Sequence, residues 1–274
     1  MSVRTPSQIK KLCEEHNLIP SKKYGQNYLI SGLPLQKMIE AAELKRGDRV
    51  YEIGPGFGIL TFELLNSGAH VRAFEIEKKL QPYWAGYEAQ YENLEMVWGN
   101  ALRHWDEYVK KEDRPYIVVA NLPYQITSEM LQVILESTNP PKTLVCMVQK
   151  EVAERIVARP GDMSILAVSV QYFGHPRIVV TVSKGSFWPS PSVDSAIICV
   201  SGIQTKTKNK DFFSLVKAGF HHKRKMLSKN LSEALHRDRE EVVSALISIG
   251  LNEKIRAEEL SVEHWVKLNE LLTR

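Results

Sequence analysis

Residues 49–58, RVYEIGPGFG, carry the pattern that decides the fold: a short apolar run that ends in three closely spaced glycines. The run 49–53 predicts a strand, and the apolar residues after Gly58 predict a helix over 59–67. Glycines between a strand and a helix let the backbone turn sharply and approach a ligand closely, while the amino end of the helix favours an anion. The stretch is therefore typical of a nucleotide-binding turn in an α/β domain.

Short β-branched runs alternate with helical stretches between residues 49 and 200, the pattern of an α/β domain with a largely parallel sheet. The expected strands are 49–53, 70–75, 94–98, 116–120, 143–149, 177–183 and 193–200, the last two forming an antiparallel, hairpin-like edge. The expected helices are 59–67, 77–90, 127–137 and 150–158. Residues 163–173 favour a helix, although their apolar content also fits a strand.

A polar, Lys-rich segment at 202–210 indicates a linker. We therefore expect one domain over 1–204, with an N-terminal helical arm over about 1–30, and a small all-helical domain over 205–274. The apolar residues after the linker recur near helical spacing and predict one helix: Phe212, Val216, Phe220, Leu227, Leu231 and Leu235. Further helical pattern follows at 239–249 and 262–272.

The composition is that of an ordinary globular protein: 274 residues, 43% hydrophobic and 25% charged. The three cysteines lie far apart, so neither a disulfide framework nor a zinc site is indicated, and a reducing cytoplasm is expected. We expect neither a signal peptide nor a membrane span. The net charge of +4 is uneven, because residues 206–239 hold 10 basic and 3 acidic side chains. This excess favours a polyanion partner, although a solvated basic helix explains it equally well.

Polar side chains follow three more of the predicted strands. Glu75 and Ile76 end the second strand about twenty residues after the glycines, where a carboxylate can bind both hydroxyls of a ribose. Asn100 and Ala101 follow the third strand, where a polar side chain can reach an adenine edge. Because parallel strands share one carboxyl edge, a ligand that contains a nucleoside is expected there.

The fourth strand, 116–120, runs directly into Asn121-Leu122-Pro123-Tyr124. The Asn121 side-chain oxygen and the Leu122 carbonyl can accept two N–H bonds from an exocyclic amino group, while the ring stacks on Tyr124. These groups suit a flat heteroaromatic substrate. A strand followed by a proline turn is the plain alternative.

Four further motifs, in order along the chain, extend the pattern: residues 24–29 (YGQNYL), 147–153 (MVQKEVA), 187–195 (FWPSPSVDS) and 220–227 (FHHKRKML). Together with the glycine turn and residues 121–124, they resemble the KsgA-type family of ribosomal RNA small-subunit adenine N6,N6-dimethyltransferases, over nearly the whole chain.

The resemblance implies a Rossmann-like S-adenosylmethionine-dependent methyltransferase sheet with a small all-helical C-terminal domain, and S-adenosylmethionine as the methyl donor without a metal. The implied activity converts two adjacent adenosines near the 3′ end of small-subunit (16S-type) rRNA to N6,N6-dimethyladenosine during ribosome biogenesis. The implied cofactor-binding residues are Gln26, Asn27, Leu29, Gly54, Gly56, Glu75, Ile76, Asn100, Ala101 and Asn121. The implied catalytic residues are Asn121, Leu122, Tyr124 and Phe187, whose two rings would sandwich the target adenine.

No general base is expected, because the attacking nitrogen needs alignment and acceptors for its developing positive charge. Phe187 is expected at a strand-end surface because it opens a proline-rich loop. The basic tail is expected to grip RNA phosphates of a pre-ribosomal particle through Lys217, Lys223, Arg224, Lys225 and Lys229, and a monomer is expected.

The chain departs from the family pattern at three places. Asn100 stands where the family usually has Asp, and its side-chain carbonyl is expected to accept the adenine N6 hydrogen bond with reduced affinity. Tyr24 and Tyr28 replace Phe, which preserves ring stacking. Met163-Ser164 stands where a Tyr-Gly pair is common.

Three other functions remain open at this level. One is a large-subunit rRNA adenine methyltransferase of the antibiotic-resistance type, against which the basic tail and the Phe187 loop argue. Another is a non-catalytic RNA-binding assembly factor of the same fold, which Asn100 slightly favours. A nicotinamide dehydrogenase is more remote, since nothing after residue 125 supplies an evident hydride-transfer acid.

Overall fold

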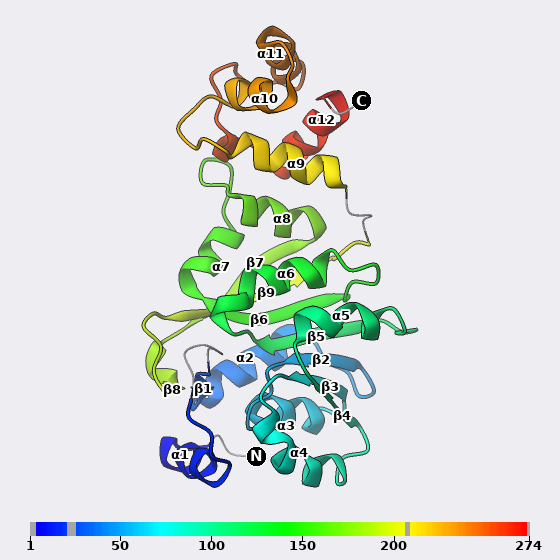
Figure 1. Ribbon diagram of the computed structural model, residues 1–274, viewed down its shortest axis with the longest axis vertical. Coiled ribbons are helices and arrows are strands. Elements are labelled where there is room, and N and C mark those ends of the chain that lie inside the picture. Colours follow the sequence, from blue (N-terminus) through cyan, green and yellow to red (C-terminus); the bar gives the residue numbers. More distant parts are fainter. Residues whose placement is uncertain (1–3, 21–25, 206–208, 273–274) are drawn as a thin grey trace. The chain divides into compact units, whose positions relative to one another are not determined.

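The computed structural model of the chain describes residues 4–20, 26–205 and 209–272 (Figure 1). Packing divides the chain into two compact units, Met1–Ala153 with Gly174–Thr205 and Glu154–Phe173 with Lys206–Arg274. The segment Glu154–Phe173 thus packs with the C-terminal helices. The domain boundary predicted from the sequence, after residue 204, places this segment in the first domain instead. Among the described residues, no helix is both long enough and apolar enough to cross a membrane.

The first unit is built on a seven-stranded mixed sheet in the order β4-β3-β2-β5-β6-β9-β7. Its strands are β2 (Arg49–Ile53), β3 (His70–Glu75), β4 (Leu94–Trp98), β5 (Tyr116–Asn121), β6 (Thr143–Gln149), β7 (His175–Val182) and β9 (Ser195–Ser201). The first five are parallel, and β9 pairs antiparallel with both β6 and β7. The predicted strands and the antiparallel pair are confirmed. Within the sheet, β9 lies between β6 and β7, and β7 forms the edge.

Helices cover both faces of this sheet (Figure 1). The helices of this unit, with α7 crossing into the second, are α1 (Pro6–Glu15), α2 (Gly32–Ala42), α3 (Ile59–Asn66), α4 (Gln81–Glu88), α5 (Ala101–Val109), α6 (Thr127–Leu135) and α7 (Lys150–Ile156). Because alternate strand residues point to opposite faces, the sheet has two cores. Met38 of α2 packs with Val119 and Met147 on one face, and Trp105 of α5 packs edge-on against Tyr51 on the other.

The expected helices over 59–67, 127–137 and 150–158 are confirmed with slightly earlier ends, and that over 77–90 divides into a short 3₁₀ turn and α4. Helices α2 and α5 were not predicted. The N-terminal arm contains α1, which begins with a capping box between Thr5 and Gln8. A separate two-residue pair joins β1 (Tyr28–Leu29) to β8 (Phe187–Trp188) and ties the end of this arm to the proline-rich loop.

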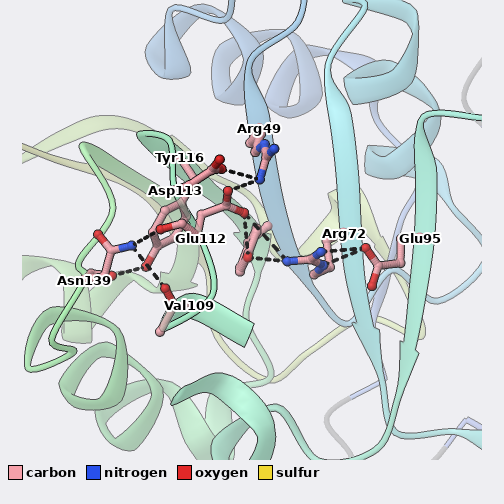
Figure 2. A network of polar contacts seen from close by, with 9 residues as sticks. Arg49, Arg72, Glu95, Val109, Glu112, Asp113, Tyr116 and Asn139 are labelled. Atoms are coloured by element: carbon pink, nitrogen blue, oxygen red, sulfur yellow. Dashed lines mark hydrogen bonds and ion pairs between the residues drawn. The ribbon is translucent and has the colours of Figure 1, made fainter. Parts of the chain in front are cut away.

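A polar network fixes the connection between α5 and β5 to the sheet, near the amino ends of the strands. Figure 2 shows the buried carboxylate of Glu112 between Arg49 and Arg72. Its Oε2 accepts a hydrogen bond of 3.0 Å from the Tyr51 hydroxyl, and Arg72 also pairs with Glu95 at 2.8 Å. A buried carboxylate is tolerated when it is paired in this way. The network therefore fixes the start of β5 to the sheet, at the opposite end of the strand from Asn121.

The second unit contains α8 (Ile165–Phe173), α9 (Lys210–Gly219), α10 (Leu227–Leu235), α11 (Arg239–Ser248) and α12 (Val262–Leu272). Residues 163–173 are thus confirmed as mainly helical, as are the two later helices. The prediction of one helix through residues 212–235 is wrong. α9 ends at Gly219, and a turn over residues 220–226 precedes α10. Asn230 stabilises this turn, because its Nδ2 donates to the Gly219 and His222 carbonyls at 2.7 and 3.1 Å.

Candidate active site at the carboxyl ends of the strands

Aromatic side chains pack against the glycine-rich turn between β2 and α3 and donate hydrogen bonds to its carbonyls. Gly56 has a φ of +54°, and a Cβ there would lie 3.1 Å from the Tyr28 ring. Trp84 Nε1 donates to the Gly56 carbonyl at 2.9 Å, and the Tyr83 hydroxyl donates to the Phe57 carbonyl at 2.9 Å. The backbone of the turn is therefore held in place, and its left-handed conformation together with the close Tyr28 ring favours glycine at position 56.

Glu75, at the end of β3, is oriented by backbone amides. Its Oε2 accepts from Gly56 N at 3.0 Å and its Oε1 accepts from Glu77 N at 2.8 Å. Burial raises the pKa of Glu75, while these backbone hydrogen bonds act in the opposite direction. The carboxylate is thus presented beside the glycine-rich turn in one fixed orientation.

A cavity of about 100 Å³ lies where these elements meet. It is lined by eight of the predicted cofactor-binding residues: Gln26, Asn27, Leu29, Gly54, Gly56, Glu75, Ile76 and Asn121. Of the motif that includes Gln26, residues Tyr24 and Gly25 lie outside the described residues, and so does the stacking expected of Tyr24. Ile76 is 45% exposed, an apolar surface of the kind that a purine ring can cover. The sequence therefore anticipates much of this lining.

Asn100 and Ala101 are absent from the described lining of this cavity. Asn100 is the N-cap of α5, and its Oδ1 accepts from Leu102 N at 3.0 Å. The expected hydrogen bond from an adenine amino group to this oxygen stays a prediction, and it would have to use the second lone pair of an oxygen that already caps the helix.

Glu52 is a cavity residue that the sequence reasoning did not select. Its side chain is 1% exposed, and its Oε2 lies buried without a hydrogen-bond partner in the described part of the chain. Burial raises the pKa of Glu52 to about 8; the Thr61 hydroxyl acts against this rise, and the Glu75 carboxylate adds to it. A carboxylate inside an otherwise apolar strand, two residues before the glycines, was the available sequence signal.

Glu52→Gln is expected to stabilise the protein more at pH 8 than at pH 5. The folded pKa lies above the ordinary value of 4.5, so the folded chain keeps a proton that the unfolded chain releases. The free energy of unfolding therefore falls as the pH rises through this window, and glutamine removes that loss. We expect the variant to gain roughly 1–3 kcal/mol relative to wild type between the two pH values, measured by urea unfolding. A difference between the two proteins that stays constant with pH would contradict the assignment.

Residues 121–124 join the cavity to a neighbouring groove of about 660 Å³. Asn121 lines the cavity, and its Nδ2 donates to the Asn27 carbonyl at 3.4 Å, so that the amide oxygen is the end left to meet a ligand amino group. Leu122 has a buried side chain, and its N–H donates to the Met147 carbonyl at 3.2 Å. Tyr124 is half-buried and lines the groove, whereas Gln26 and Asn27 line both spaces. An aromatic face and amide groups thus stand beside the cavity.

Phe187 does not lie at the surface. Its side chain is 3% exposed and belongs to the hydrophobic core, since β8 pairs Phe187 with Leu29 of β1. The expectation of a strand-end surface position is therefore wrong. Pro189, Ser190 and Pro191 of the same loop line the groove in its place.

The five basic residues predicted to bind RNA all belong to the second unit, on α9, on the turn over residues 220–226 and on α10. Four of them are exposed: Lys217, Lys223, Arg224 and Lys229. Lys225 is half-buried, and its Nζ lies 3.7 Å from Glu233 Oε2. The turn over residues 220–226 therefore presents a compact basic surface.

Two solved structures share this architecture. The crystal structure of a dimethyladenosine transferase from Plasmodium falciparum aligns with a TM-score of 0.74 and 26% identity, covering 88% of this chain and 95% of its own. That of the 23S rRNA methyltransferase ErmE aligns with a TM-score of 0.71 and 26% identity, covering 90% and 100%. With its sheet order and glycine-rich turn, the chain is a Rossmann-like methyltransferase.

The sequence comparisons define a more specific class of protein than the fold does. A protein of Dehalococcoides mccartyi named ribosomal RNA small subunit methyltransferase A is 41% identical over 266 residues, covering 96% of this chain and 91% of that protein. The family model for ribosomal RNA adenine dimethylases matches residues 20–274. The chain belongs to this ribosomal RNA adenine dimethylase family.

Proposed function

We propose that this protein binds S-adenosylmethionine in the strand-end cavity and transfers methyl groups to N6 of two adjacent adenosines near the 3′ end of small-subunit rRNA. The observation that carries the proposal is the position of residues 121–124, whose Asn121 lines the cofactor cavity while Tyr124 lines the adjoining groove. A base stacked on Tyr124 would then have its amino group beside Asn121.

The cavity fits this cofactor. Glu75 suits the ribose hydroxyls, and the exposed face of Ile76 suits the adenine ring. Glu52 presents to the cationic part of the ligand a buried carboxyl whose Oε2 has no hydrogen-bond partner among the described residues. The amino end of α3, which follows the glycine-rich turn, suits the anionic part of the ligand. When bound, S-adenosylmethionine supplies a methyl group activated by a sulfonium. The proposal includes no metal ion.

The residues of the chain act by alignment and by electrostatics. The Asn121 side-chain oxygen and the Leu122 carbonyl accept hydrogen bonds from the target amino group and stabilise its developing positive charge. Tyr124 stacks on the base, which contributes about 1–3 kcal/mol in comparable sites. Phe187, the expected second ring, lies in the core and could contact the base only if it left the core. We therefore assign the stacking of the base to Tyr124 alone. No general base takes part.

The choice of the small subunit is supported by the relative that is 41% identical to this chain and is named for that substrate. The fold alone does not discriminate, since the 23S rRNA enzyme aligns almost as well as the dimethyladenosine transferase. The basic turn over residues 220–226 is proposed to grip RNA phosphates of a pre-ribosomal particle. We further propose that the protein acts as a monomer in the cytoplasm.

The proposal is tested by incubating the protein with S-adenosylmethionine carrying a labelled methyl group and with separated, unmethylated small or large ribosomal subunits. Label is expected in small-subunit RNA alone. Label in large-subunit RNA would favour the antibiotic-resistance type of activity. RNA binding without transfer would favour an assembly factor.

Asn100→Asp is expected to tighten cofactor binding by about 3- to 10-fold. An aspartate can cap α5 with one oxygen and accept the adenine amino group with the other, whereas asparagine has a single side-chain oxygen for both tasks. Calorimetric titration with S-adenosylhomocysteine measures the gain. S-inosylhomocysteine, which lacks the amino group, is the control ligand, and an equal gain for both ligands would show that Asn100 does not read this group.

A further inference from the structure

The ring of Tyr124 is held at its far end by a residue to which no role has been assigned above. The Tyr124 hydroxyl lies 2.6 Å from Ser195 Oγ, a contact between positions 71 residues apart. Ser195 opens β9 and is fully buried. We propose that Ser195 is a positioning residue that holds the Tyr124 ring in place for the target base by fixing the hydroxyl end of its axis. This inference rests on the proposed function, because it concerns the substrate side of the same site.

Ser195 stands at a rigid place in the sheet. Its neighbours across β9 are Gln149 of β6 and Val182 of β7. The preceding residue, Asp194, is also fixed: its carbonyl accepts from Lys150 N at 3.0 Å, and its Oδ1 accepts from Lys184 N at 2.9 Å. The oxygen that contacts the Tyr124 hydroxyl therefore belongs to a strand that is paired on both sides.

The other end of Tyr124 is fixed as well. The backbone around Pro123 is closed by Ile126 N, which donates to the Pro123 carbonyl at 3.1 Å, and by the Thr127 hydroxyl, which donates to the same oxygen at 3.2 Å. A tyrosine held at its backbone and at its hydroxyl oxygen keeps its ring axis in one direction, so the ring cannot swing away from the groove by rotation about χ1. Since in-line transfer demands alignment of the reacting atoms, a misplacement of about 1 Å can lower a rate on the order of 100-fold.

The test is a double-mutant cycle on kcat/KM for transfer to unmethylated small subunits, with Ser195→Ala, Tyr124→Phe and the double variant. Each single change removes the same hydrogen bond, so each is expected to lower kcat/KM by about 5- to 20-fold, and the double variant no further. Losses that multiply, or a Ser195→Ala variant as active as wild type, would overturn the assignment. A merely structural role of Ser195 would give the multiplied result.

Two controls keep the cycle interpretable. Ser137→Ala removes another buried serine, whose hydroxyl donates to the Asn139 carbonyl at 3.3 Å, and it is expected to leave kcat/KM unchanged. Should Ser195→Ala unfold, Ser195→Cys fills the site with a somewhat larger thiol that hydrogen-bonds only weakly, and it is expected to show the same non-additivity with Tyr124→Phe. A wild-type chain without transfer would overturn the proposed function and this inference together. An active wild type with multiplied losses would overturn only the role of Ser195.

Discussion

Asn121→Ala is expected to lower kcat by about 10²- to 10³-fold, while the Kd for S-adenosylmethionine changes by less than about threefold. In the proposed role, the contact of Asn121 Nδ2 with the Asn27 carbonyl at 3.4 Å leaves the side-chain oxygen to stabilise the positive charge that develops only as the methyl group is transferred. An acceptor used in this way stabilises the transition state more than the bound cofactor. Single-turnover rates on small subunits and calorimetric titration of the cofactor measure the two quantities separately.

The matched control is Asn66→Ala, an exposed asparagine at the last position of α3, which is expected to leave both quantities unchanged. Equal losses of kcat and of cofactor affinity in Asn121→Ala would contradict the assigned role. They would instead make Asn121 a general support of the cavity wall.

Reversing the charge of Lys223 and Arg224 together is expected to weaken binding of small subunits by about 10²-fold at 0.1 M salt and to flatten the salt dependence of binding. Both side chains are exposed on the turn over residues 220–226, whose backbone Asn230 holds. Each lost phosphate contact removes about one unit from the slope of log K against log salt. Filter binding measured between about 0.05 and 0.3 M salt gives this slope.

The corresponding control reverses Lys110 and Lys111, two exposed lysines that follow α5 in the first unit. Their reversal changes the net charge equally, so it is expected to shift affinity only slightly and to preserve the slope. If both double variants behave alike, the effect is one of net charge, and the turn is not the RNA contact.

The strands and the positions of the polar residues at their ends were predictable because they follow local rules. The β-branched runs, the glycines after residue 53 and the polar residues after each run place Glu75 and Asn121 at one edge once the sheet is parallel. Helix α5 was missed because Asn100 was interpreted as a ligand contact, although an asparagine before an amphipathic stretch is also an N-cap signal.

The errors lie where distant segments decide the structure. The burial of Phe187 depends on the pairing of β8 with β1, between segments about 160 positions apart, which no local pattern reveals. The break after α9 is hidden by apolar residues that keep helical spacing through it, and the Asn230 contacts that stabilise the turn become visible only in the folded chain. The bond between Tyr124 and Ser195 likewise joins two motifs whose sequences show no sign of contact.

The most direct test of the central claim is the identity of the modified nucleoside. After exhaustive reaction with S-adenosylmethionine, small-subunit RNA would be digested to nucleosides, and the products would be identified by mass spectrometry. The account predicts N6,N6-dimethyladenosine from two adjacent positions near the 3′ end of the small-subunit RNA and none from large subunits treated in the same way. Methyl groups on another base, or dimethyladenosine in large-subunit RNA alone, would contradict it.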